Sequence, residues 1–146
     1  MGVTKPELLN NADESRVIAA IAEAEKQTSG EIRVHLEARL NGDAMERAKK
    51  VFEMLGMAKT KEKNGVLVYV AVENHILVIL GDSGIYNKVP HDFWADTRNI
   101  MLEQFKNGLY ADGLCLGIAQ AGVQLSKFFP RRHDDQNELS NTISFG

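Results

Sequence analysis

The sequence predicts an α/β fold with a small mixed sheet, and three observations lead to this prediction. Residues 31–40 alternate between apolar and polar side chains, which is the period of a β-strand. Residues 66–72 and 76–80 are apolar runs separated by Glu73-Asn74-His75, a pattern typical of a hairpin of buried strands. Segments with helical periodicity lie before, between and after these strands, as in an α/β domain.

The first three elements carry local start and stop signals. Capping residues at 11–13 begin a helix that Ser29-Gly30 ends. The strand over 31–40 has an apolar face for the core and a polar face that we expect to be solvated, which favours a place near the sheet edge. Gly42-Asp43 begins the next helix, where Glu46 has the spacing of a capping box. The polar face of the strand consists of Glu31, Arg33, His35, Glu37 and Arg39.

Two further helices follow the hairpin. Pro90 begins the first, and Asn107-Gly108 ends it in the manner of a C-cap. The second extends from about Asp112, which we expect to be its N-cap, to Phe129. Small residues recur in it at helical spacing and predict close backbone packing that offsets their low helix propensity: Gly113, Gly117, Ala121 and Gly122.

The order of the elements predicts which segments meet. A right-handed crossover between residues 31 and 72 makes the first two strands parallel, and the hairpin makes the third antiparallel to both. The start of the first strand at Glu31, the start of the second at Asn64-Gly65 and the end of the third at Asp82 then lie at one edge of the sheet.

Length and composition restrict the class of protein. The 146 residues suffice for one domain, which we place at residues 1–130 and follow with a polar tail at 131–146 that can fold back on it. A net charge of −3 argues against nucleic acid as a partner. The single cysteine, Cys115, and the lack of a long apolar stretch favour a soluble, cytoplasmic protein without a membrane span.

The loop Gly81-Asp82-Ser83-Gly84 is the strongest candidate for function. A carboxylate at the end of a strand is a hard-oxygen ligand for a cation, and glycines let the backbone approach a ligand. The alternative is that Asp82 only caps its own turn. Serine catalysis is set aside because the spacing of an esterase nucleophile is absent.

Other oxygen ligands could join Asp82. Glu31 lies at the same predicted edge, and Asp134, Asp135 and Glu138 form an acidic cluster in the tail, with Ile143 and Phe145 available as apolar anchors. The alternative for these carboxylates is a solvated surface. Hard oxygen ligands select Ca²⁺ or Mg²⁺ over zinc or copper. A weaker expectation assigns phosphate binding to Lys61 and Lys63, which lie in the loop before the hairpin.

Four motifs in order resemble the TPM domain family, which is named for a thylakoid lumen phosphatase, a photosystem II repair protein and a modulator of levamisole receptors. They are Ser29-Gly30-Glu31-Ile32, Lys63-Asn64-Gly65-Val66-Leu67, Gly81-Asp82-Ser83-Gly84-Ile85, and Gly108-Leu109-Tyr110 with Gly113 and Gly117-Ile118. The resemblance implies a three-layer α/β/α sandwich with a sheet of three to four strands. For some members it implies divalent-cation binding or acid phosphatase activity, and the tail is similar to that of short bacterial members.

We therefore expect a domain that binds Ca²⁺ or Mg²⁺ and acts as a non-enzymatic stress or assembly module with a protein partner. No catalytic residue is assigned. The alternative is a metal-assisted acid phosphatase acting on phosphomonoesters, in which the ion polarises a phosphoryl oxygen and lowers the pKa of a bound water.

Overall fold

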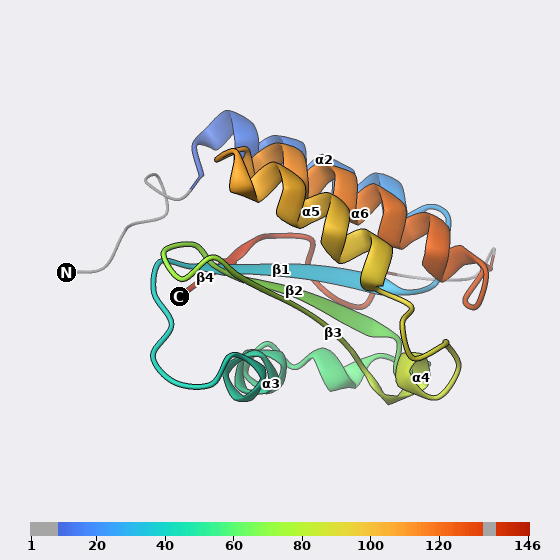
Figure 1. Ribbon diagram of the computed structural model, residues 1–146. Helices are drawn as coiled ribbons and strands as arrows, with labels where there is room; N and C mark the ends of the chain where they lie inside the picture. Colours follow the sequence, from blue (N-terminus) through green and yellow to red (C-terminus); the bar gives the residue numbers. More distant parts are fainter. Residues whose placement is uncertain (1–8, 133–136) are drawn as a thin grey trace.

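A four-stranded mixed sheet in the order β3-β2-β1-β4 forms the middle layer of the protein (Figure 1). The structure is a computed structural model and describes residues 9–132 and 137–146. The strands are β1 (Glu31–Glu37), β2 (Gly65–Ala71), β3 (Ile76–Gly81) and β4 (Ser144–Phe145).

Helices cover both faces of the sheet, which confirms the α/β/α sandwich. Helices α2 (Asn11–Glu25), α5 (Ala95–Lys106) and α6 (Tyr110–Ser126) lie over one face (Figure 1). Helix α3 (Ala44–Met54) and the short 3₁₀ helix η1 (Met57–Lys59) lie over the other. A single turn, α4 (Ser83–Tyr86), follows β3.

The predicted strand directions are confirmed. β1 pairs in parallel with β2, with Glu31 opposite Gly65, and the crossover between them contains α3. β2 pairs antiparallel with β3, with Val66 opposite Gly81. The tail returns to the sheet, where β4 pairs in parallel with β1 and the Ile143 side chain is buried.

The expected solvated face of β1 is wrong. Glu31, His35 and Glu37 are only 3%, 3% and 5% exposed, because α3 and the returning tail cover them. β1 does lie near the sheet edge, next to the two-residue outer strand β4, and it ends at Glu37 instead of residue 40. The alternation therefore marks a strand with one apolar and one polar face, and the polar face is buried at Glu31, His35 and Glu37.

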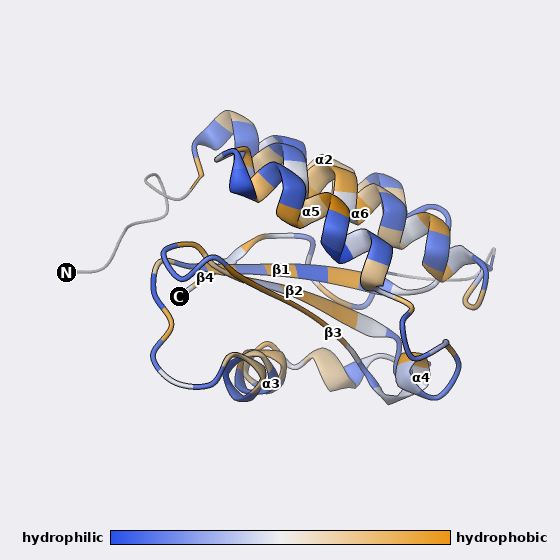
Figure 2. Cartoon of the chain, in the orientation of Figure 1, coloured by the Kyte–Doolittle hydropathy of each residue, from blue (hydrophilic) through white to orange (hydrophobic). Residues whose placement is uncertain are grey.

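The apolar core has one part on each side of the sheet. Ile32, Val34 and Leu36 of β1 face α2, α5 and α6, whereas Leu67 and Tyr69 of β2 face α3. In Figure 2 most of β2 and β3 carries hydrophobic colours. Burial of these side chains supplies most of the free energy that holds the layers together.

Of two predictions about helix N-caps, one is confirmed and the other is wrong. Asp43 caps α3 as expected, since its side chain accepts a hydrogen bond from the Glu46 N–H at 2.9 Å. Asp112 is not an N-cap: α6 begins earlier, at Tyr110, and Asp112 accepts a hydrogen bond from Arg16 at 2.7 Å. Helix α5 begins at Ala95, after the segment around Pro90.

The small residues of α6 pack closely, as predicted. A methyl group on Gly113 would lie 2.5 Å from the Phe105 ring, and one on Gly122 would lie 2.8 Å from the Ala24 side chain. Gly117 likewise has no room beside Met101. Among the described residues, no helix is both long and apolar enough to cross a membrane.

Candidate functional site

The three segments predicted to converge do meet at one edge of the sheet. The Glu31 N–H donates to the Asn64 carbonyl at 3.3 Å, and the Asp82 N–H donates to the Gly65 carbonyl at 2.9 Å. The strand register places Glu31, Gly65 and Asp82 in one row on the face that α3 and η1 cover. Two carboxylates therefore flank a residue without a side chain.

Glu31 lies against the tail. The Leu139 N–H donates to Glu31 Oε1 at 2.5 Å, and the Glu138 carboxylate accepts from the Lys61 N–H at 3.1 Å. Glu31 Oε2 is buried and has no hydrogen-bond partner among the described residues. Burial raises the pKa of Glu31 to about 7, and the neighbouring Glu138 carboxylate adds to this. A buried carboxyl group, that of Glu31, thus adjoins an exposed one, that of Glu138.

Asp82 has a local structural role. Its carboxylate accepts from the Ser83 N–H at 2.7 Å at the start of α4, while Asp82 Oδ2 is buried without a partner among the described residues. The Gly84 N–H donates to the Lys63 carbonyl at 2.8 Å, and a methyl group on Gly84 would lie 2.5 Å from that oxygen. Glycine at 84 lets the loop pack directly on the backbone before β2.

Glu31 and Asp82 are not in contact with each other. Gly65 lies between them. A methyl group added to Gly65 would lie 3.1 Å from the Met57 carbonyl and 3.6 Å from the Leu139 side chain. The described residues contain no group of three or more His, Cys, Asp or Glu side chains placed to hold a metal ion. Asp134 and Asp135 lie outside the described residues. The structure thus brings Glu31 together with Glu138, and leaves Asp82 apart.

The two lysines proposed for phosphate binding lie in the loop before β2. Lys61 contributes its backbone N–H to Glu138. The Lys63 ammonium donates to the Ala58 carbonyl at 2.5 Å. The Lys63 ammonium is therefore hydrogen-bonded to the backbone of η1, which follows α3.

Sequence reasoning missed Glu25, which lies close to Glu31. Glu25 Oε2 accepts from the Ile32 N–H at 2.9 Å, and the side chain is buried. Burial raises the pKa of Glu25 to about 7, and the charge of Glu31 acts in the same direction. Its place at the end of the amphipathic helix α2 resembles that of any surface glutamate, so only the tertiary structure reveals it.

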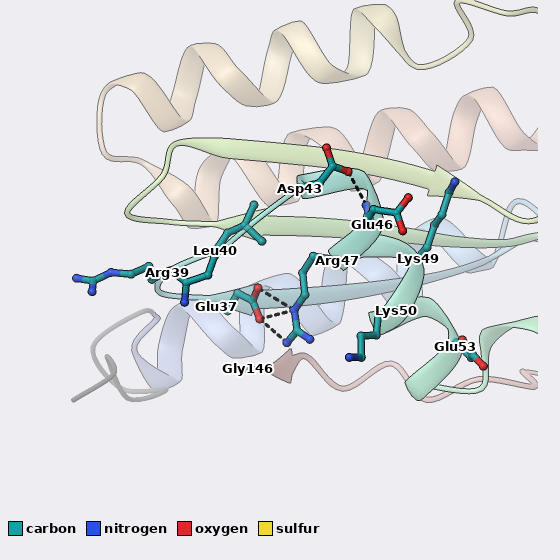
Figure 3. Close-up of a pocket in the computed structure, with 11 residues that line it drawn as sticks. Glu37, Arg39, Leu40, Asp43, Glu46, Arg47, Lys49, Lys50, Glu53 and Gly146 are labelled. Carbon is teal, nitrogen blue, oxygen red and sulfur yellow. Dashed lines mark hydrogen bonds and ion pairs between the residues drawn. The ribbon is translucent and has the colours of Figure 1, made fainter.

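Sequence reasoning also missed a polar cluster at the opposite end of β1. Arg47 of α3 donates to both oxygens of Glu37, at 2.8 and 3.1 Å (Figure 3). The Tyr69 hydroxyl also donates to Glu37, and His35 Nε2 lies 3.1 Å from it. Burial opposes ionisation of Glu37, but these hydrogen bonds outweigh it and lower its pKa to about 2. Burial lowers the pKa of His35.

This cluster borders a hollow of about 720 Å³ at the carboxyl ends of β1 and β4 (Figure 3). Arg39, Lys50 and Gly146 line it. Open α/β sheets often bind ligands at such an end. Here the charges are mixed: Glu37 is paired with Arg47, and Arg39 with Glu73 at 3.1 Å. The sequence carried one signal for the cluster: Tyr69 stands in the otherwise aliphatic strand β2, which pairs with the charged, alternating strand β1.

A family model described as the TPM domain matches residues 3–124. The chain belongs to the TPM domain family. This match confirms the resemblance drawn from the four motifs, two of which, Ser29–Ile32 and Gly81–Ile85, contain Glu31 and Asp82.

Solved structures agree with this TPM assignment. The NMR structure of the BA42 protein from the psychrophilic bacterium Bizionia argentinensis has a TM-score of 0.92 and 50% sequence identity, covering 98% of this chain and 99% of that one. The N-terminal domain of a protein from P. gingivalis has a TM-score of 0.70 at 19% identity, covering 88% and 85% of the two chains. The N-terminal domain of a Corynebacterium glutamicum protein has a TM-score of 0.60 at 14% identity, covering 91% and 78%. The latter two show the fold alone. No curated protein matches the chain.

Proposed function

We propose that this TPM domain binds a divalent cation, Ca²⁺ or Mg²⁺, at the sheet edge where Glu31 and Glu138 adjoin. The observation that carries the proposal is Glu31 Oε2, a buried carboxylate oxygen without a partner among the described residues and next to a second carboxyl group. Buried polar atoms in proteins are nearly always satisfied, so an orphaned carboxylate oxygen favours an additional ligand.

The donor chemistry fits a hard cation. Carboxylate and backbone carbonyl oxygens are the ligands of Ca²⁺ and Mg²⁺, and Ca²⁺ takes six to eight of them. Glu31 and Glu138 would supply the first carboxylate ligands. Asp134 and Asp135 of the tail are proposed as further ligands. Asp82, with its own unpartnered Oδ2, is separated from Glu31 by Met57 and Leu139 and would join them only through a movement of its loop.

Binding of the ion would compete with a proton. Burial, with a smaller contribution from repulsion by the adjoining Glu138 carboxylate, raises the pKa of Glu31 to about 7. A divalent cation removes this repulsion and favours the ionised form, so its affinity would rise with pH until Glu31 is deprotonated. The tail would be fixed more firmly to β1 at the same time.

The proposed role is a non-enzymatic stress or assembly module, in which the ion orders loops for a protein partner. Metal-assisted hydrolysis of phosphomonoesters is the alternative. The burial of Glu31 favours it, because burial raises the pKa of this carboxyl group to about 7, a value suited to general acid–base catalysis.

Thermal unfolding of chelator-treated protein in Ca²⁺ and Mg²⁺ titrations tests the cation site. An ion at about 100 times its Kd should stabilise the wild type by about 2.7 kcal/mol. Glu31→Gln should abolish this gain, and Glu53→Gln on the exposed surface of α3 should keep it. Flat curves for the wild type would refute the site. Turnover of p-nitrophenyl phosphate that requires Mg²⁺ and Glu31 would decide for the phosphatase.

A further inference from the structure

Strand β3 presents an unprotected edge. It is the outer strand of the sheet, and within the described residues nothing pairs with its free side. Its residues, Ile76–Gly81, include no charged residue and no proline. Natural edge strands usually carry such residues to prevent pairing with other chains. Because β3 lacks charged residues and proline, its free edge is suited to pairing with another strand.

The backbone groups that point outward follow from one hydrogen bond. The Asp82 N–H donates to the Gly65 carbonyl, so residues 82, 80, 78 and 76 direct their backbone groups toward β2. Leu77, Ile79 and Gly81 therefore direct theirs away from the sheet. Arg98 of α5 donates to the Leu77 carbonyl at 3.3 Å, which agrees with this orientation. Within the described residues, no hydrogen bond is made to the outward backbone groups of Ile79 and Gly81.

A hollow of about 680 Å³ runs beside this edge, between α3 and the segment from α4 to α5. Met45 and Lys49 line it from α3, and Tyr86 and Trp94 from the other side. Met45 is 43% exposed and Tyr86 is 74% exposed. Large apolar side chains on both sides of a free edge are suited to receive the alternate side chains of an added strand.

The charged side chains around the hollow indicate which side chains an added strand should carry. The titratable side chains that line the hollow are Lys49, His91 and Tyr86, and no carboxylate lines it. No ion pair joins Lys49 to another described residue. An acidic side chain on the incoming strand would therefore meet an unpaired cation, whereas a basic one would be repelled.

We propose that β3 binds an extended segment of a partner protein as an added strand, with alternate apolar residues and an acidic residue opposite Lys49. Backbone hydrogen bonds to Ile79 and Gly81 supply affinity, and the apolar hollow and Lys49 supply selectivity. This surface lies beyond the proposed cation site and does not require an ion.

An NMR titration tests the proposal with a peptide of about eight residues of alternating valine and glutamate, capped at both ends. At about 1 mM peptide, the amides of Leu77, Ile79 and Gly81 should shift, and their hydrogen exchange should slow by about tenfold or more. The same peptide with N-methylated alternate amides, or with lysine in place of glutamate, should bind at least about tenfold more weakly.

Variants of the protein provide the matched controls. Ile79→Pro removes one outward N–H and no bond to β2, so it should abolish binding. Lys49→Glu should weaken binding about tenfold or more. Lys50 does not line the hollow beside β3, so Lys50→Glu should leave binding unchanged. The proposal is overturned if the wild type does not bind the peptide, if N-methylation has no effect, or if β3 is already protected by a second copy of the chain. The N-methylated peptide keeps the test valid should Ile79→Pro fail to fold.

Discussion

The Leu139 N–H donates to the Glu31 carboxylate at 2.5 Å, so the tail is held at the first residue of β1. The same carboxylate adjoins that of Glu138 and keeps one oxygen without a partner among the described residues. Because Glu31 combines burial with a neighbouring like charge, its protonation state links the tail to the solution pH and to any cation that binds there.

We expect the ion-free protein to lose stability as the pH rises toward neutrality. The pKa values of Glu25 and Glu31 are raised to about 7 in the folded state, above the ordinary value of 4.5. The folded state therefore binds more protons than the unfolded state between these values. Their stabilising contribution is full below about pH 4.5 and is lost as the pH passes 7.

Chemical denaturation across this range measures the effect. Glu31→Gln should remove about 1 to 3 kcal/mol of the pH dependence, because glutamine cannot ionise. A wild type whose stability rises from pH 5 to pH 8 in chelator would contradict this account of the two carboxyl groups.

Arg47→Met should cost about 3 to 5 kcal/mol, because it leaves the Glu37 carboxylate buried without its cation. Arg39→Met is the matched control: Arg39 pairs with Glu73 at the surface and should contribute less than about 1 kcal/mol. Urea denaturation of both variants measures the difference. Equal losses would show that the Glu37 cluster does not depend on Arg47.

Gly117→Ala should destabilise the protein by about 1 to 3 kcal/mol, since the added methyl group would overlap the Met101 side chain. Leu116→Ala, at an exposed position in the same helix, should change stability by less than about 1 kcal/mol. Thermal unfolding of the two variants measures the comparison. A stabilised Gly117→Ala would mean that α5 and α6 are less tightly packed than the structure shows.

Two substitutions at Asp82 separate its cap from its charge. Asp82→Ala should cost about 1 kcal/mol without any ion, because it removes the hydrogen bond to Ser83. Asp82→Asn keeps a capping oxygen and should unfold like the wild type in chelator, yet gain less from Ca²⁺. If calcium stabilises Asp82→Asn as strongly as the wild type, Asp82 is a cap and not a ligand.

Local patterns were sufficient to predict three strands of the sheet and their directions, but not the pairing of β4 with β1. The period of two in β1 and the hairpin of β2 and β3, with one crossover, placed Glu31, Gly65 and Asp82 at one edge. Alternation shows which residues share a face, but it does not show what covers that face. The polar face of β1 was therefore expected to be solvated, although α3 and the tail bury it.

The parts of the site that escaped prediction depend on contacts distant in sequence. Glu37 acquires its partner Arg47 only because α3 crosses over β1, and Glu25 is buried only because the chain turns back into Ile32. The separation of Asp82 from Glu31 depends on Met57 and Leu139, which both lie over Gly65 although they are far apart in the sequence.

The central claim is that a divalent cation replaces a proton at Glu31. An NMR titration of the Glu31 side-chain carboxyl carbon, from about pH 4 to pH 9 with and without Ca²⁺, tests this claim most directly. The account predicts a pKa of about 7 without the ion and a pKa lower by at least about one unit with it. A pKa that saturating Ca²⁺ leaves unchanged would contradict the cation site.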